Sequence, residues 1–250
     1  MYTNFMKDEI NTLFSKIKEA KHIVFFGGAG VSTASGLLDF RSKDGLYKLK
    51  SKYGVPYETI LSHSYYEFNT ETFFKFYKEF MINTSAKPNI VHTFLAKLEK
   101  TKDLTIITQN IDNLHTLAGS KNVIELHGSI NRNYCEKCGC LYDLNGFLKL
   151  PGIIPKCSKC GGVVKPDVVL YEEPLDNNNT IKAIIALQKA DLLIVAGTSL
   201  RVYPAAGLIN YFYGNNIILI NKENLSLSKK PILQISKDMK EVFEELDKLF

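Results

Sequence analysis

Short apolar runs that alternate with helical patterns constrain the fold of this 250-residue chain more than any other feature. The runs are rich in Val and Ile and have the length of buried strands, and between them apolar residues recur at helical spacings of three and four. Such alternation is typical of crossover units on a parallel sheet with helices on both faces. We therefore predict an α/β fold. The predicted strands are Ile23–Phe26, Leu104–Ile107, Val123–Leu126, Leu192–Ala196 and Ile217–Ile220.

Two segments interrupt this alternation. Residues 46–80 are aromatic and helical in pattern, whereas residues 132–165 hold all five cysteines and several turn-forming Pro and Gly residues. We predict that these insertions form a smaller domain, and that residues 1–45, 81–131 and 166–250 form the larger one. Ligands of open parallel sheets bind outside the carboxyl ends of the strands, so the residues after each strand are the first candidates for a site.

Composition narrows the possible partners. The net charge is +5, but only three of the 31 basic residues are arginines, Arg41, Arg132 and Arg201, whereas proteins that recognise bases rely on arginine. Direct binding of nucleic acid is therefore not expected. No apolar run approaches the roughly 18 residues that span a bilayer, and Lys7, Asp8 and Glu9 interrupt any signal-peptide core. We expect a cytoplasmic protein without membrane contact.

The cysteines form two pairs, Cys135 with Cys138 and Cys157 with Cys160, separated by 18 residues. In a cytoplasmic chain, clustered cysteines favour a metal over disulfides. Four thiolates around one tetrahedral Zn²⁺ leave no position for water or substrate, so the predicted zinc is structural. The fifth cysteine, Cys140, is surplus to this set and is predicted to be a nearby free thiol; the alternative is that it replaces Cys138 as a ligand.

A glycine-rich segment, residues 27–36, follows the first predicted strand. Glycines at a strand-to-helix turn let the backbone approach a pyrophosphate, here at Gly28 and Gly30. The dehydrogenase fingerprint would require a third glycine in place of Thr33 and an acidic residue about 20 positions later, and the chain has neither. A tight turn without a ligand is the alternative.

The next loop contains Phe40 and Arg41. A guanidinium beside an aromatic ring, close to a phosphate-binding turn, is suited to hold a dinucleotide and cover its sugar. The alternative is an exposed arginine without a ligand.

Polar residues follow two further strands. Asn110 and Asp112 offer a carboxamide and a carboxylate to an amide-bearing ring, although Asn110 as a helix cap with a first-turn acid is an equally simple interpretation. His127 ends the following strand, and Gly128 after it leaves access to the ring. With an ordinary pKa of about 6.5, a histidine is suited to act as a general base at neutral pH. A structural hydrogen bond is the alternative role.

Small polar residues also follow the last two predicted strands. Thr198 and Ser199 precede a second strand–turn–helix unit, and Asn221 follows Ile217–Ile220. These groups are placed to meet the adenosine half of a dinucleotide, although each alone is an ordinary turn or cap residue.

Taken in chain order, these motifs resemble those of the sirtuins, a family of NAD-dependent protein-lysine deacylases. The resemblance extends from about Ala20 to Asp238 and indicates a short bacterial member. The motifs are Gly28-Ala29-Gly30-Val31-Ser32, Asp39-Phe40-Arg41, Thr108-Gln109-Asn110-Ile111-Asp112, Leu126-His127-Gly128, the two cysteine pairs, Pro166-Asp167-Val168-Val169 and Gly197-Thr198-Ser199-Leu200.

The resemblance implies a Rossmann-like large domain and a small domain made of a zinc ribbon (132–165) and a helical module (46–80). NAD and an acylated lysine would enter the cleft between them, with His127 as the catalytic base, Asn110 as a second catalytic residue, and Val169, Leu170 and Tyr171 beside the substrate peptide. The implied cofactor residues are Gly28, Ala29, Gly30, Thr33, Phe40, Arg41, Gln109, Asn110, Ile111, Asp112, His127, Thr198, Ser199, Asn221 and Asp238.

The implied reaction is the transfer of an acyl group, most favourably acetyl, from a protein lysine to ADP-ribose, which releases nicotinamide. Two other functions stay open: mono-ADP-ribosyl transfer on the same fold, and a non-catalytic zinc-ribbon binding module.

The chain also departs from the family pattern, with Gly27 in place of threonine, Leu38 in place of proline and Glu172 in place of glycine. The Tyr-x-x-Arg pair of desuccinylases is matched only by Tyr77 and Phe80, which favours uncharged acyl groups.

Overall fold

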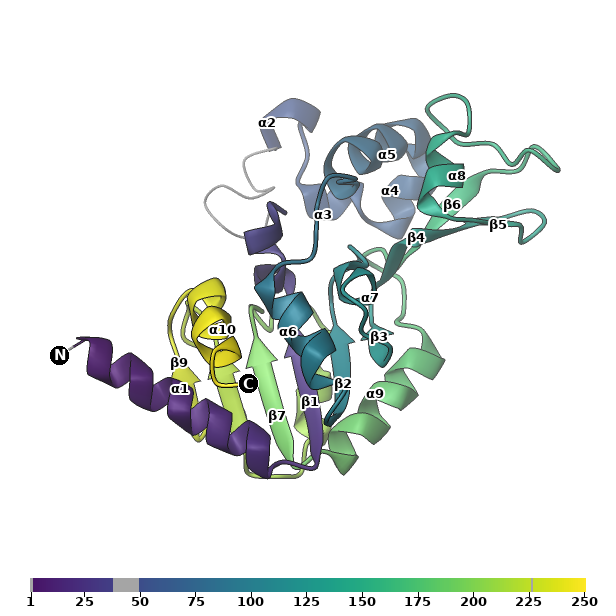
Figure 1. Ribbon diagram of the computed structural model, residues 1–250. Helices are drawn as coiled ribbons and strands as arrows, with labels where there is room; N and C mark the ends of the chain where they lie inside the picture. The colour runs from purple at the N-terminus through teal and green to yellow at the C-terminus, as the bar shows by residue number, and fades with distance from the viewer. Residues whose placement is uncertain (1, 38–49, 226) are drawn as a thin grey trace.

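Six parallel strands form the main sheet, in the order β3-β2-β1-β7-β8-β9 (Figure 1). The computed structural model describes residues 2–37, 50–225 and 227–250. The chain adds strands outward from β1 in one direction and then from β7 in the other, so the strand order reverses between β1 and β7. The strands are β1 (His22–Gly27), β2 (Asp103–Thr108), β3 (Val123–Glu125), β7 (Leu192–Ala196), β8 (Ile217–Ile220) and β9 (Leu233–Ile235).

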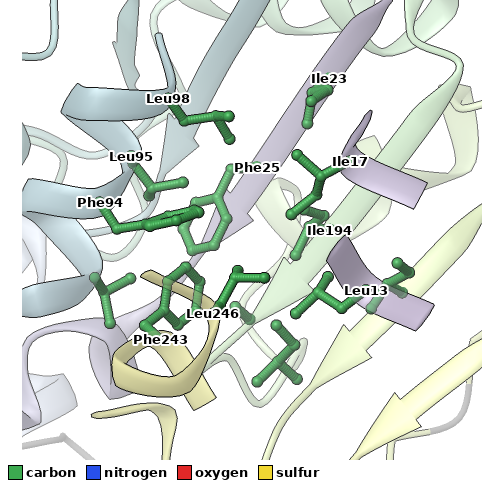
Figure 2. Packing of buried hydrophobic residues seen from close by; sticks show 14 of the residues in the cluster. Leu13, Ile17, Ile23, Phe25, Phe94, Leu95, Leu98, Ile194, Phe243 and Leu246 are labelled. Carbon is green, nitrogen blue, oxygen red and sulfur yellow. The ribbon is translucent and has the colours of Figure 1, made fainter. Parts of the chain in front are cut away.

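Helices cover both faces of this sheet, because alternate residues of each buried strand point to opposite sides. Phe25 of β1 packs in a cluster with residues of α1 (Tyr2–Glu19), α6 (Ile90–Leu98) and α10 (Met239–Asp247), as Figure 2 shows. Its neighbour Phe26 packs on the other face against α9 (Asn177–Lys189) and η5 (Ala205–Tyr211). Both phenylalanines are completely buried.

Side-chain caps start the main helices. The Asn89 side chain accepts from the Val91 N–H at the start of α6, and Asp176 accepts from Asn179 at the start of α9. Such bonds satisfy amide groups that the first turn of a helix leaves unpaired.

A second sheet has three antiparallel strands in the order β5-β4-β6. A core of aromatic and aliphatic side chains joins it to a set of short helices, and this part lies beyond the carboxyl edge of the main sheet (Figure 1). The strands are β4 (Gly128–Cys135), β5 (Leu141–Tyr142) and β6 (Val164–Val168), and the helices are α2 (Lys50–Tyr53), α3 (Tyr57–Ile60), α4 (His63–Phe68), α5 (Thr70–Phe76), η4 (Tyr77–Met81) and α8 (Leu144–Leu148).

The predicted α/β fold is confirmed, and each of the five predicted strands is present. The run predicted as Val123–Leu126 ends as a strand at Glu125, and the helix predicted after Thr198 and Ser199 is a 3₁₀-helix. None of the helices in the described ranges is long and apolar enough to cross a bilayer.

Candidate functional site

The carboxyl ends of β1 and β7 approach so closely that only glycine fits between them. A Cβ on Gly28 would lie 2.8 Å from the carbonyl oxygen of Gly197, and one on Gly30 would lie 2.8 Å from its Cα. The Gly28 N–H donates to Ala196 O (3.1 Å) and the Gly30 N–H to Gly197 O (2.8 Å). These two amides are therefore bonded within the protein, so a pyrophosphate beside this turn would have to be held by other groups.

Two short 3₁₀-helices follow, η1 (Ala29–Val31) and η2 (Thr33–Ser35). Ala29 begins the first. Thr33 begins the second, and its exposed hydroxyl donates to Gly30 O at 3.0 Å. Phe40 and Arg41, together with Leu38, lie outside the described residues.

Ser32 connects the two polar residues that follow β2. The Asn110 carboxamide donates to the Ser32 hydroxyl (3.0 Å), which donates in turn to the Asp112 carboxylate (2.6 Å). Asp112 also accepts from the Leu114 N–H at the start of α7 (Leu114–Leu117). The N-cap position of this helix is Asn113, so Asn110 does not cap it. Burial raises the pKa of Asp112, although both bonds that it accepts oppose this effect. The sequence interpretation did not single out Ser32, although it lies within the glycine-rich segment.

His127 lies in the two-residue connection between β3 of the main sheet and β4 of the second sheet. Its Nδ1 is 2.8 Å from the carbonyl oxygen of Gln109. Because a carbonyl only accepts, Nδ1 carries the hydrogen, and Nε2 of the neutral ring keeps a free lone pair. Burial lowers the pKa of His127, so the ring is neutral at pH 7. This is the protonation state that a general base requires.

Gly128 allows a close crossing of two chain segments beside His127. Its φ is +79°, and a Cβ here would lie 1.9 Å from the carbonyl oxygen of Asp167. The neighbouring Val169 N–H donates to the His127 carbonyl at 3.0 Å. The sequence interpretation assigned Gly128 to access, whereas the structure shows that the glycine is required for packing.

Gln109 and Thr198 join the ends of β2 and β7. The Gln109 carboxamide donates to the Thr198 hydroxyl (3.0 Å), which also accepts from the Leu200 N–H (3.1 Å). Ser199 is the next residue after Thr198. Ile111, which follows Asn110, is tied to the second sheet, because its carbonyl accepts from the Ile130 N–H at 2.9 Å.

Two predicted residues lie at the ends of β8 and β9. Asn221 follows β8 and its carboxamide donates to Glu223 O (2.8 Å). Asp238 caps α10 through the Lys240 N–H and forms an ion pair with Lys222 at 2.7 Å. The pair with Lys222 keeps the pKa of Asp238 below its ordinary value.

The predicted peptide strand is tied to the second sheet and to the short helices. The Val169 N–H donates to His127, the Leu170 N–H to the Glu173 carboxylate (2.8 Å) and the Tyr171 N–H to Leu61 O (2.9 Å). All three amides are therefore bonded within the protein. A peptide that adds alongside this segment must donate to its carbonyl oxygens, which have two lone pairs each.

Glu172 adopts a left-handed conformation, with φ at +76°. Its carboxylate accepts from the Ser64 N–H (2.9 Å) and from the Ser64 hydroxyl (3.0 Å) at the start of α4. The carboxylate that the sequence placed near the peptide groove is thus bound to the helical part.

The four paired cysteines meet at one point, and their sulfur atoms all lie within 4.8 Å of one another. Cys135 Sγ is 3.4 Å from Cys160 Sγ, and Cys138 Sγ is 3.7 Å from Cys157 Sγ. Tetrahedral ligands at the usual Zn–S distance would be about 3.8 Å apart, so this set fits one zinc ion. Cys140 is not in the cluster.

Tyr77, the nearest match to the tyrosine of desuccinylases, is completely buried in the aromatic core of the second part of the molecule. Its ring stacks on Phe73. It therefore does not line an open acyl site.

Comparison with known proteins agrees with these features. The model of the Sir2 family matches residues 28–204. The chain is 56% identical to the NAD-dependent protein deacetylase of Clostridium acetobutylicum, over 95% of this chain and 97% of that protein. It is 55% identical to the protein of the same description from Clostridium tetani, over 92% and 93%. A solved Sir2 complex with a p53 peptide and NAD+ superposes with a TM-score of 0.86 at 32% identity, covering 96% of this chain and 98% of that one.

Proposed function

The chain belongs to the Sir2 family, and we propose that it removes acetyl and other uncharged acyl groups from protein lysines in an NAD-dependent reaction. The observation that carries this proposal is the bond from His127 Nδ1 to the Gln109 carbonyl. It leaves a neutral imidazole with a free Nε2 at the carboxyl edge of the main sheet, which is where open α/β sheets bind ligands. The names of the similar deacetylases support the same activity.

The polar groups at this edge fit a dinucleotide. When bound, NAD supplies an electrophilic ribose carbon with nicotinamide as its leaving group. Asn110, Ile111 and Asp112 would hold the nicotinamide end. The hydrogen bonds of Ser32 to Asn110 and Asp112 fix the positions of these two side chains relative to each other. The rest of the cofactor would contact Gly28, Ala29, Gly30, Thr33, Gln109, Thr198, Ser199, Asn221 and Asp238, together with Phe40 and Arg41 outside the described residues.

His127 would act as the general base through Nε2 and withdraw a proton from a ribose hydroxyl. The resulting imidazolium keeps its Nδ1–H bond to the Gln109 carbonyl, which stabilises the added charge. General base catalysis of this kind contributes roughly 10²- to 10⁴-fold to a rate.

The substrate would be an acylated lysine in an extended segment beside Val169, Leu170 and Tyr171. Zinc would be structural, held by Cys135, Cys138, Cys157 and Cys160. We also propose the domain boundaries predicted above and a cytoplasmic location. Direct binding of nucleic acid is not part of this proposal.

The direct test is nicotinamide release that requires both NAD and an acetyl-lysine peptide. His127→Gln should lower the rate at least 100-fold, whereas His22→Gln should leave it within twofold, because His22 lies at the amino end of β1. Full activity of His127→Gln would contradict the assigned base.

Two further measurements separate the alternatives. Labelled ADP-ribose on protein rather than on the released acyl group would indicate a mono-ADP-ribosyltransferase. Absence of NAD binding by calorimetry would indicate a zinc-ribbon binding module.

A further inference from the structure

Arg132 forms two ion pairs across the junction between the two sheets. Its Nη1 is 2.6 Å from a carboxylate oxygen of Glu125, and its Nε is 2.7 Å from one of Asp167. Glu125 is the last residue of β3 in the main sheet, whereas Asp167 belongs to β6 in the second sheet. The Glu125 side chain is only 12% exposed, so removal of Arg132 would leave a mostly buried carboxylate without this partner.

The backbone turns Arg132 toward this position. Strands β4 and β6 pair at Ser129 with Asp167 and again at Asn133 with Pro166, so the three residues between Ser129 and Asn133 form a bulge. Arg132 is the last residue of the bulge. A bulge redirects the side chains it carries, which here allows one guanidinium to contact both carboxylates.

These contacts close a ring around His127. Glu125 precedes His127 by two residues, Asp167 precedes Val169 by two residues, and the His127 carbonyl accepts from the Val169 N–H at 3.0 Å. Arg132 joins the two carboxylates on the other side of this crossing. The Arg132 ion pairs thus add to the backbone pairing of β4 with β6 in fixing the segment that carries the imidazole to the segment beside the acyl-lysine strand.

We propose that Arg132 is a positioning residue for deacylation, which fixes the predicted base His127 relative to the peptide strand that begins at Val169. The proposal rests on the proposed function, but this ring of contacts can be tested without measuring deacylation. Arg132 does not touch the reacting atoms. It acts through Glu125 and Asp167, and a guanidinium holds two carboxylates in a fixed geometry that an ammonium cannot reproduce.

The first test compares Arg132→Met, which keeps an unbranched apolar side chain without charge, with Arg132→Lys. A matched control is Lys97→Met, which removes the 2.9 Å ion pair between α6 and α10 far from His127. With an acetyl-lysine peptide, kcat/KM should fall at least tenfold for Arg132→Met, by an intermediate amount for Arg132→Lys and by less than twofold for Lys97→Met. The KM for the peptide should rise more than the KM for NAD. An Arg132→Met enzyme within twofold of the wild type would overturn the proposal.

The second test measures hydrogen exchange at the Val169 amide. Exchange of this amide should be at least tenfold faster in Arg132→Met and unchanged in Lys97→Met. Equal protection of the Val169 amide in both variants would show that Arg132 does not hold this crossing together and would overturn the proposal, whatever the activity of the wild type. Conversely, faster exchange in a wild type that never deacylates would support the ring and contradict the proposed function.

A double-mutant cycle covers the case in which Arg132→Met does not fold. Glu125→Gln combined with Arg132→Lys should cost little more kcat/KM than the worse single variant, because both break the same contact. Fully additive losses would show that the two residues act separately and would overturn the proposal.

Discussion

At the residue scale, one hydrogen bond sets the chemistry of His127. The Gln109 carbonyl fixes the tautomer, and burial lowers the pKa of the ring below its ordinary value of 6.5. A base works in its neutral form, so activity should be at its plateau at pH 7 and fall only as the ring takes up a proton on acidification. The acidic limb of kcat/KM, measured between pH 5 and 8, should therefore have its midpoint below pH 6.5. A midpoint above pH 7 would contradict this assignment.

Glu172 allows a second prediction at this scale, because it has a backbone conformation that favours glycine. Glu172→Ala should destabilise the protein by about 1–2 kcal/mol, since it keeps the strained φ and loses two bonds to Ser64. Glu172→Gly should cost less, because glycine relieves about 1 kcal/mol of strain. Urea unfolding of both variants measures the difference, and an alanine variant as stable as the wild type would show that the Ser64 bonds contribute nothing.

The residue types in the sequence indicated where the candidate site lies, but not which hydrogen bonds its groups form. Asn110, Asp112 and His127 do follow strands of the main sheet. The amides of Gly28 and Gly30, however, are bonded to Ala196 and Gly197, which lie far along the chain. A glycine-rich turn looks the same in sequence whether its amides face a ligand or a neighbouring strand.

At the element scale, the clearest of the predicted strands are those buried on both faces, although the edge strand β3, of which only Ile124 is buried, was predicted as well. All five residues of β7 and all four of β8 are buried, which produces a continuous apolar run. By contrast, β9 lies at the edge of the sheet and buries only Ile235, and β4 contains a bulge that breaks its alternation. Such strands depend on their neighbours rather than on their own pattern, so local sequence did not reveal them.

The zinc ribbon gives a prediction at the same scale. Because Cys135 ends β4 and the other three ligands lie in the connections between β4 and β6, removal of zinc should unfold this sheet and abolish activity without changing a catalytic residue. Cys138→Ser should lower the zinc content well below one per chain, whereas Cys140→Ser should retain a full ion, because Cys140 is outside the cluster. Elemental analysis distinguishes the two. Equal zinc loss in both variants would assign Cys140 as a ligand.

At the scale of the whole molecule, two buried histidines connect α6 and α7 beneath the candidate cofactor site. The ring centroids of His92 and His115 are 4.6 Å apart, and neither nitrogen of His115 has a hydrogen-bond partner within the described part of the chain. His92 Nδ1 accepts from the Asn89 N–H, and the Asn89 side chain donates to Val31 O and to Ser35. The pair therefore supports the segment that holds η1 and η2 in place.

This pair makes stability depend on pH. Burial lowers the pKa of His92 to about 4 and, together with the neighbouring His92, that of His115 to about 3, whereas both rise to about 6.5 on unfolding. The unfolded chain thus binds more protons as the pH falls below 6.5, and the native state loses stability in that direction until the pH approaches about 3.

Replacement of His115 should remove its share of this loss. Between pH 7 and pH 5 that share is about 2 kcal/mol, since one pKa unit corresponds to about 1.4 kcal/mol. The difference in unfolding free energy between these two pH values should therefore be smaller by about that amount in His115→Leu. The exposed neighbour Thr116, replaced by Ala, should leave the difference unchanged. Urea unfolding at both pH values measures it, and a His115→Leu protein with the wild-type pH dependence would mean that the acid sensitivity arises from other groups.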